Sequence, residues 1–311
     1  MDYSTHLHST SYGATRWKKY IKDKICKTDD NVDVFYQVIQ KGRKAKKTLI
    51  LANGLGGRLY SWGPIIEAFI DEYKIITWDY RGLFDSETPK NLADLSINRH
   101  AHDLQNILEV EKINSIIGCG WSMGVQVILE FTSHFPNKCE KLILINGTHG
   151  HALTTGLQPF FRIPFTQDTF HELIETIYGS DYLQKLFCFI PQKKIITNIF
   201  SKTLKYLWKN PELPQFTEWF FNDVFHEKNF RNILKLLQEL DAHSVFHHLR
   251  EINQPALVIS GGLDIITPRY QSKELYRKLP NAEYINYPLC SHFVVLEKSE
   301  ALVKKIRSFL E

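Results

Sequence analysis

The sequence lacks the features of a membrane-spanning chain, a disulfide-rich chain and a strongly charged chain. No run approaches the roughly 18 consecutive apolar residues that a membrane-spanning helix needs. The five cysteines are odd in number, far apart and free of any C-x-x-C spacing, which argues against a disulfide framework or a zinc ribbon. The net charge is only +4 over 311 residues, far from the basic surface of a nucleic-acid binder, so we expect no nucleic-acid partner.

The N-terminal segment lacks the features of a targeting signal. Residues 1–13 have neither a basic region nor an apolar region of the kind that begins a secretory signal. We therefore expect a cytoplasmic protein, and we interpret the glycosylation pattern Asn146-Gly147-Thr148 as accidental. Five basic residues between Lys41 and Lys47 favour a solvated hairpin tip, with weak contact to an anionic membrane surface as the alternative.

Apolar residues are abundant, at 43% of the chain, and their order predicts an α/β fold. Two alternating runs, Tyr20–Lys27 and Val32–Ile39, flank a turn-rich tetrapeptide and predict an antiparallel hairpin. Wholly apolar short runs then alternate with helical patterns, as in a parallel sheet with helices on both faces. The predicted strands are Thr48–Ala52, Ile75–Trp78, Ser115–Cys119 and Lys141–Ile145, and the predicted helices are Tyr60–Glu72, Ile97–Val110 and Met123–Phe135.

The pattern changes in the middle of the chain and then returns. Of the 71 residues from Phe160 to Phe230, 17 are aromatic, against 13% of the whole chain. We predict a core of residues 1–147 and 249–311, with 148–248 inserted as a helical cap. Most of its aromatics should pack between helices, and the rest should line an apolar pocket; the most clustered are Phe160, Phe161, Phe165, Trp219, Phe220, Phe221 and Phe225. The α/β pattern resumes with the strands Pro255–Ser260 and Ala282–Tyr287 and with helices near Tyr270–Leu279 and Ser299–Leu310.

A candidate nucleophile lies in the pentapeptide Gly120–Gly124, which reads G-x-S-x-G between an apolar run and a helical pattern. In that context a sharp strand-to-helix turn lifts the serine hydroxyl above the sheet. Ser122 is therefore the predicted nucleophile. The amide of the next residue, Met123, can donate a hydrogen bond to a developing oxyanion.

A serine nucleophile needs an imidazole base, and the imidazole needs a carboxylate to orient it. Asp264 follows the predicted strand Pro255–Ser260, and His292 follows the strand after it. Both should lie at the carboxyl edge of the sheet. Asp241 is an alternative acid, disfavoured because it does not follow a strand directly. The glycine-rich loop Asn53–Gly57 should supply the second oxyanion amide.

Taken together, these motifs resemble those of the α/β-hydrolase superfamily, in its cap-bearing esterase, lipase and C–C hydrolase branch. The resemblance implies a mostly parallel eight-stranded sheet, with Ser122 as nucleophile, His292 as base, Asp264 as acid and the amides of Leu55 and Met123 as oxyanion hole. It implies no cofactor and no metal. The motifs are Asn53–Gly56, Trp78–Gly82 with Ser86, Gly120–Gly124, Gly262–Asp264 with Pro268, and Ser291–Phe293.

Two positions depart from the family pattern. Asn53 stands where the family usually has histidine, and Phe84 stands where the turn Asp79–Ser86 usually has a glycine. We interpret that turn as scaffolding.

The leading hypothesis is a serine hydrolase of lipophilic carboxylic esters. One alternative is a C–C hydrolase of keto acids, for which Arg162 is the one obvious cation early in the insertion. A catalytically silent ligand-binding protein is the alternative from another class. Epoxide hydrolysis and dehalogenation are disfavoured, because those branches typically carry aspartate at the position of Ser122.

Other residues with reactive side chains receive less weight. His243 and His247, four apart and near Asp241, could share a helix face and hold a metal, but two histidines at this spacing are more often surface residues. His149 and His151 lie where the core meets the insertion, and for His149 solvation in a loop is preferred to substrate contact. Two cysteines, Cys119 and Cys290, lie close in sequence to the triad without a pattern that would make either the nucleophile.

Overall fold

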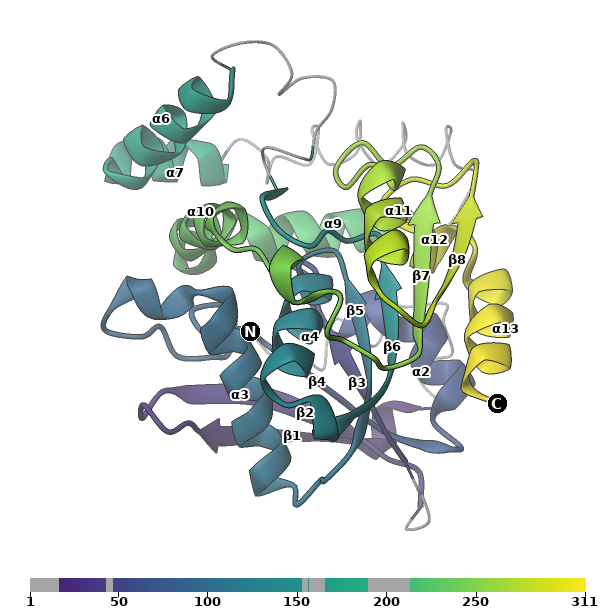
Figure 1. Cartoon of the computed structure of the whole chain (residues 1–311). Coiled ribbons are helices and arrows are strands. Elements are labelled where there is room, and N and C mark those ends of the chain that lie inside the picture. The colour runs from purple at the N-terminus through teal and green to yellow at the C-terminus, as the bar shows by residue number, and fades with distance from the viewer. Residues whose placement is uncertain (1–16, 43–46, 153–155, 157–165, 190–212) are drawn as a thin grey trace.

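An eight-stranded sheet forms the centre of the computed structural model, which describes residues 17–42, 47–152, 156, 166–189 and 213–311 (Figure 1). The strand order is β1-β2-β4-β3-β5-β6-β7-β8. From β4 to β8 neighbouring strands pair in parallel, and β2 pairs antiparallel with both β1 and β4. The predicted fold class is thereby confirmed. The strands are β1 (Ile21–Lys27), β2 (Asp33–Ile39), β3 (Lys47–Ala52), β4 (Tyr73–Trp78), β5 (Ile116–Trp121), β6 (Cys139–Ile145), β7 (Ala256–Gly261) and β8 (Ala282–Tyr287).

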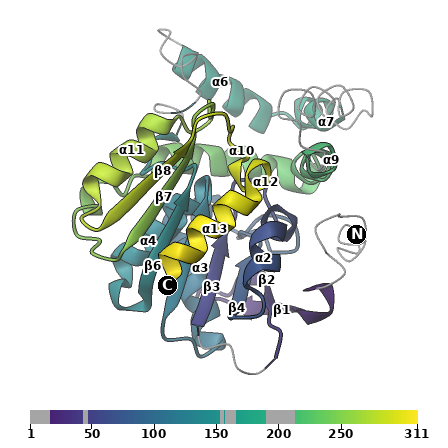
Figure 2. The same ribbon diagram turned by 90° about the vertical axis from the view of Figure 1, so that its right-hand side faces the viewer.

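Helices cover both faces of this sheet (Figure 1; Figure 2). One face carries α2 (Gly63–Phe69), α12 (Val294–Glu297) and α13 (Ser299–Leu310); the other carries α3 (Ile97–Val110), α4 (Met123–His134) and α11 (Arg269–Lys278). Along β3, Leu49 and Leu51 face the first layer, whereas Ile50 and Ala52 face the second. All four are 0% exposed, which explains why the strands are apolar on both sides.

The boundaries differ from the predicted ones at two informative places. Strand β5 continues to Trp121, so that the turn of the G-x-S-x-G motif begins at the serine itself. The predicted helix Tyr60–Glu72 is a short 3-10 helix, η3 (Leu59–Trp62), followed by α2, which starts beside Pro64. Proline is favoured in the first turn of a helix because its missing N–H would have no partner there. The other 3-10 helices are η2 (Lys18–Tyr20), η4 (Leu92–Leu95), η5 (Pro136–Lys138) and η7 (Phe246–His248).

Four described helices lie between β6 and β7 in the chain, and we call them the inserted helices: α6 (Thr166–Tyr178), α7 (Asp181–Phe189), α9 (Leu213–Val224) and α10 (Glu227–Ala242). Helices α9 and α10 cross the carboxyl edge of the sheet, and α6 and α7 lie outside α10 (Figure 1). Phe230 and Leu234 of α10 pack with Ile174, Ile177 and Cys188 in a small separate core. The predicted aromatics Phe160, Phe161 and Phe165, and also Arg162, lie outside the described residues.

The strand order creates a crevice at one edge of the sheet. Strand β3 lies between β4 and β5. After the carboxyl end of β3 the chain first forms β4 on one side of it and then forms β5 on the other side. At such a switch point the loops after two adjacent strands diverge and leave space for a ligand. Ala52, the last residue of β3, pairs with Gly120 of β5, so the glycine-rich loop and Ser122 begin side by side.

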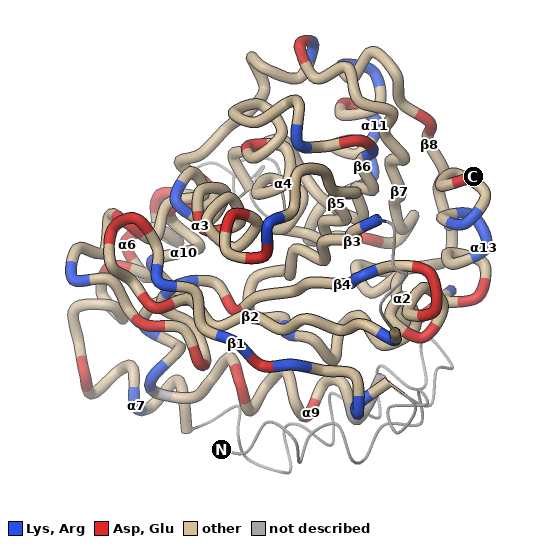
Figure 3. Tube along the Cα trace, turned by 90° about the horizontal axis from the view of Figure 1, so that it is seen from below, with Lys and Arg blue, Asp and Glu red and all other residues tan. Residues whose placement is uncertain are grey.

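Charges of both signs are interspersed over the face seen in Figure 3. Most of the basic segment Lys41–Lys47 lies outside the described residues, but its two ends form ion pairs, Lys41 with Asp71 and Lys47 with Glu140. Membrane contact by this segment stays a prediction. None of the described helices is both long enough and apolar enough to cross a membrane.

The turn after β4 depends on a buried cation. Arg81 is 0% exposed, and its guanidinium donates to Asp103 (Nε to Oδ2, 2.8 Å) and to Asp30 (Nη1 to Oδ2, 2.7 Å). We expect Arg81→Met to lower the free energy of unfolding in urea by about 3–5 kcal/mol, because it strands the buried carboxylate of Asp103. Lys305→Met, which breaks a surface pair with Glu283, should cost less than about 1 kcal/mol. Equal losses in the two variants would contradict this assignment.

Candidate active site

Ser122 joins β5 to α4 in a backbone conformation that serine rarely adopts. Its φ is 56° and its ψ is −119°. Such a residue costs on the order of 1–3 kcal/mol and persists only where its surroundings fix it. Here the Ser122 amide donates to the Ile145 carbonyl, and the Val125 amide donates to the Ser122 carbonyl, each at 3.0 Å. The strand, sharp turn and helix that give the motif its meaning are therefore all present.

The two glycines of the motif permit close backbone approaches on both sides of Ser122. A Cβ atom on Gly120 would lie 2.4 Å from the Gly124 carbonyl oxygen, and one on Gly124 would lie 2.0 Å from the Ala52 carbonyl oxygen. Real Cβ atoms do not come so close to backbone atoms. A side chain at Gly120 would push α4 away from β5, one at Gly124 would push it away from β3, and either would displace the serine.

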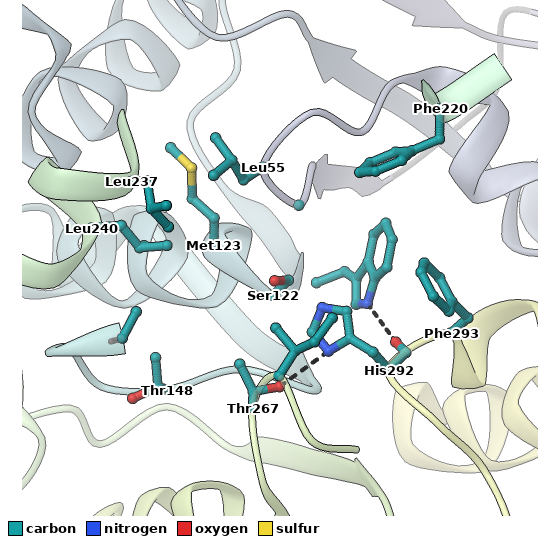
Figure 4. A pocket seen from close by; sticks show the side chains of 14 residues that line it. Leu55, Ser122, Met123, Thr148, Phe220, Leu237, Leu240, Thr267, His292 and Phe293 are labelled. Atoms are coloured by element: carbon teal, nitrogen blue, oxygen red, sulfur yellow. Dashed lines mark hydrogen bonds between the residues drawn. The ribbon is translucent and has the colours of Figure 1, made fainter. Parts of the chain in front are cut away.

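Asp264 and His292 meet on the loops after β7 and β8. His292 Nδ1 lies 2.8 Å from Asp264 Oδ2, and both residues are buried. Asp264 Oδ1 accepts hydrogen bonds from the amides of Ile266 and Thr267 at 2.9 Å each, which turns Oδ2 toward the imidazole. Figure 4 shows the His292 ring between Thr267 and Ser122, with Nδ1 on the Thr267 side. The other ring nitrogen, Nε2, lies on the Ser122 side of the ring.

Asp241, the alternative acid, lies elsewhere. It is near the end of α10, and its Oδ2 lies 3.2 Å from His171 Nε2 of α6. The carboxylate that contacts His292 is that of Asp264.

The loop after β3 is anchored by Asn53, at the position where the family usually has histidine. The Asn53 side chain donates to the Trp78 carbonyl and accepts from Trp62 Nε1, each at 2.7 Å. The main-chain carbonyl of Asn53 accepts from the Tyr80 hydroxyl, also at 2.7 Å. Asparagine thus supplies the hydrogen bonds that fix the start of the loop. Leu55, two residues later, lies at the cavity.

Met123 is the first residue of α4, so its amide has no carbonyl one helical turn earlier to bond. Helix N-termini also favour negative charge. Leu55 and Met123 both line the cavity that Ser122 lines. The two predicted oxyanion residues therefore both border the cavity near Ser122 (Figure 4).

A cavity of about 240 Å³ contains Ser122 and His292 and is otherwise mainly apolar. Among its described lining residues none is Lys, Arg, Asp or Glu. Two further polar residues, Thr148 and Thr267, turn their hydroxyls to protein partners, at 2.9 Å from the Gly150 carbonyl and 2.8 Å from the Asn146 carbonyl. The remaining lining residues are Gly54, Leu55, Trp121, Met123, Ala152, Phe220, Leu237, Leu240, Ile266 and Phe293.

The inserted helices contact both the cavity and the glycine-rich loop Asn53–Gly57, which we call the oxyanion loop after its predicted role. Phe220 of α9 and Leu237 and Leu240 of α10 line the cavity. A Cβ on Gly56, which has φ of 75°, would lie 2.4 Å from Val224 Cγ2 of α9. The glycine-rich loop therefore turns toward the serine and also leaves room for α9.

The comparisons with known proteins agree with this architecture. Residues 47–299, most of the chain, match the family model described as alpha/beta hydrolase fold. This chain belongs to the α/β-hydrolase family.

Individual relatives are distant. The "Putative carbamate hydrolase RutD" of Rhizobium rhizogenes is 26% identical over 278 residues, which cover 88% of this chain and 97% of the relative. The poly(3-hydroxyalkanoate) depolymerase of Ectopseudomonas oleovorans is 22% identical over 88% of this chain and 87% of its own. Among solved structures, the esterase EaEST of Exiguobacterium antarcticum matches with a TM-score of 0.72 at 17% identity, over 93% of this chain and 99% of its own. A likeness at this identity establishes the fold alone.

In this α/β-hydrolase the turn with Phe84 also contacts an inserted helix. Phe84 has φ of 53° at the position where the family has glycine. The Arg58 guanidinium lies 4.6 Å from the centre of the Phe84 ring. The main-chain amide of Phe84 donates to Asn229 Oδ1 of α10 at 2.9 Å. Scaffolding alone was predicted for this segment. It also joins α10 to the residue that follows the oxyanion loop.

Of the two discounted histidines, His243 is partly buried, whereas His247 is exposed as expected. Helix α10 ends at Ala242, so His243 and His247 do not share a helix face. His243 contacts Gln126 Oε1 (Nδ1, 2.7 Å) and Glu130 Oε2 (Nε2, 3.0 Å) of α4 and is not a surface residue. Within the described ranges, no group of three or more His, Cys, Asp or Glu side chains is placed to hold a metal.

His149, Cys119 and Cys290 lie near the candidate triad but are not among the described residues that line the cavity. His149 is 6% exposed, so solvation in a loop was the wrong interpretation; its Nε2 lies 3.2 Å from Glu274 Oε2, and burial lowers its pKa. His151 is exposed. Burial raises the pKa of the Cys290 thiol to about 12 and also raises that of Cys119, so both stay protonated.

Three residues near the candidate triad went unrecognised from the sequence: Thr267, Trp121 and Asn146. Thr267 Oγ1 is 2.8 Å from Asp264 Oδ2, and Trp121 Nε1 donates to the His292 carbonyl at 3.0 Å. Asn146 contacts both loops that carry the acid and the base. Its position directly after a strand, level with the other loops of the site, was the available signal.

We expect Gly56→Ala to lower the activity of this α/β-hydrolase more than Gly42→Ala does. Both glycines have positive φ, 75° and 85°, so alanine costs a similar backbone strain of about 1 kcal/mol at each. Only at Gly56 does the new methyl group collide with a neighbour, Val224, and displace either α9 or the loop. The measurement is kcat/KM with an aryl ester, together with Tm. Equal kcat/KM values for the two variants would refute the packing argument.

Proposed function

We propose that this chain is a serine hydrolase that cleaves neutral, lipophilic carboxylic esters through an acyl-enzyme on Ser122. The observation that carries the proposal is the 2.8 Å contact between His292 Nδ1 and Asp264 Oδ2, with Ser122 on the same cavity as the imidazole. Acid, base and nucleophile come from three different loops, and a chain without this chemistry has no need to hold a strained serine beside a buried histidine.

In the proposed mechanism Ser122 Oγ attacks the ester carbonyl carbon while His292 Nε2 takes the hydroxyl proton. Asp264 holds the imidazole in the required tautomer and stabilises the imidazolium that forms. The amides of Leu55 and Met123 donate to the oxyanion of the tetrahedral intermediate, an effect worth roughly 3–4 kcal/mol per donor. Collapse expels the alcohol, which receives its proton from His292. Water then cleaves the acyl-enzyme by the same steps.

The inserted helices act as a cap in this proposal. Residues 148–248 form the cap, and residues 1–147 and 249–311 form the catalytic core. Support comes from Phe220, Leu237 and Leu240, which reach the cavity from α9 and α10. The cap supplies apolar surface to the substrate, and the core supplies the reacting groups.

Cavity chemistry favours esters over the keto acids of C–C hydrolases. A substrate carboxylate needs a cationic partner when it leaves water. None of the described lining residues is Lys or Arg, and Arg162 lies outside the described residues. The volume of about 240 Å³ is below the roughly 300–1,000 Å³ of typical ligand pockets, which favours a compact substrate.

Labelling with a fluorophosphonate probe tests the nucleophile and separates this proposal from a silent ligand-binding protein. We expect the wild-type chain to be labelled and Ser122→Ala to be unlabelled. Asp264→Asn should lower kcat by roughly 10⁴-fold through loss of the histidine tautomer. Asp241→Asn, its matched control, should leave kcat near the wild-type value because that carboxylate faces His171. An unlabelled wild type, or a labelled Ser122→Ala, would sink the proposal.

A panel of p-nitrophenyl esters tests the substrate class. Each added acyl CH₂ that the cavity buries is worth about 0.8 kcal/mol, so kcat/KM should rise roughly fourfold per carbon until the cavity is full and then fall. The sharpest comparison is butyrate against hemisuccinate, which has a similar length and one carboxylate. We expect butyrate to be strongly preferred. Preference for hemisuccinate, or for a dienoic keto acid, would instead favour C–C hydrolysis. Carbamate esters on the same panel test the activity named for RutD.

A further inference from the structure

Asn146 is a fully buried polar residue at the carboxyl end of β6, beside the candidate triad. It is 0% exposed and has φ of 44°, a left-handed conformation that asparagine tolerates better than most residues. No atom of it is part of the described cavity lining, so it does not face the substrate. Burying an amide is costly unless its hydrogen-bonding groups are satisfied.

The Asn146 side chain joins the two loops that carry the acid and the base. Its Nδ2 donates to the carbonyls of Ser291 (3.0 Å) and His292 (2.8 Å) in the loop after β8. Its Oδ1 accepts from the amide of Gly261 (2.7 Å), at the end of β7, where the loop to Asp264 begins. Both N–H groups and the carbonyl oxygen of one side chain are thus used to set the spacing of two loops.

The main chain of Asn146 adds a third connection. Its carbonyl oxygen lies 2.8 Å from Thr267 Oγ1. That hydroxyl is also 2.8 Å from Asp264 Oδ2 and 3.2 Å from His292 Nδ1. A shift of Asn146 would therefore move the carboxylate, the imidazole and the hydroxyl between them relative to one another.

We propose that Asn146 is a positioning residue that sets the geometry of the Asp264–His292 pair. This inference rests on the proposed function, since it assigns a task only if the pair acts on Ser122. A glycan on this amide nitrogen would not fit the folded chain, because the nitrogen is buried and already donates two hydrogen bonds.

Two substitutions test the assignment. Asn146→Asp keeps the shape and the acceptor for the Gly261 amide, but it places a carboxylate oxygen against two carbonyl oxygens. Asn146→Gly keeps the left-handed backbone and removes all three side-chain hydrogen bonds. We expect either variant to lower kcat on an aryl ester by about 100-fold, the effect of a displacement near 1 Å, with KM little changed because no substrate contact is lost.

The matched control is Asn232→Asp. Asn232 is also buried, and its Nδ2 donates to the Gly82 carbonyl (2.7 Å) and to Thr88 Oγ1 (3.0 Å), away from the acid and base. We expect it to lower Tm and to leave kcat near the wild-type value. A spectroscopic measurement separates position from stability: the strongly deshielded proton between His292 and Asp264 should shift or vanish in the Asn146 variants and persist in Asn232→Asp.

The results distinguish a failure of the proposed function from a failure of the role proposed for Asn146. If the wild-type chain is not labelled by the fluorophosphonate, both the proposed function and the role of Asn146 are wrong. If the wild type is labelled and the Asn146 variants keep its kcat or its deshielded proton, the inference alone is overturned. Equal losses of kcat in the Asn146 variants and in Asn232→Asp would likewise overturn it, because a general loss of stability would then account for both. Should Asn146→Gly fail to fold, the same readings on Asn146→Asp decide.

Discussion

The contact between the first turn of α4 and the end of β3 is the constraint on which the site depends. Gly124 lies so close to the Ala52 carbonyl that no side chain fits between them. That approach fixes the start of α4 over the sheet and holds Ser122 at φ of 56°. It also brings the Met123 amide, at the positive end of the helix, beside the loop that carries Leu55. The positions of Ser122 and of the Met123 amide thus both follow from one backbone contact.

Two buried asparagines fix the loops around this contact. Asn53 ties the loop after β3 to β4 and η3, and Asn146 ties the loop after β7 to the loop after β8. In each case the amide pairs with buried carbonyl and N–H groups at a strand end and in the neighbouring segments. An amide suits this task because it donates and accepts at once and carries no charge. The loops that carry Leu55, Asp264 and His292 are therefore positioned by hydrogen bonds of these two asparagines.

The inserted helices and the segment just after them contact the core at several points. Val224 of α9 packs on Gly56, Asn229 of α10 binds the turn at Phe84, and His243 just after α10 reaches Glu130 of α4. Arg58 connects two of these points, since it follows the oxyanion loop and lies against Phe84. The inserted helices therefore contact both the apolar lining of the cavity and the glycine-rich loop after β3.

Local patterns in the sequence determined the order of strands and helices, the serine turn and the three loops that bear Ser122, Asp264 and His292. They could do so because strands buried on both faces, glycines at close approaches and polar residues after strands each leave a local signature. The helix break at Pro64 and the exact length of β5 depend on packing and were missed by a few residues. The sequence favoured Asp264 over Asp241, and the tertiary structure places the Asp264 carboxylate against the histidine. Tertiary structure alone decided that His149 is buried, that His243 contacts α4, and that Asn146 joins two loops more than 100 residues further along the chain. These are contacts between distant segments, and no local pattern specifies which buried polar groups will face one another once the sheet has formed.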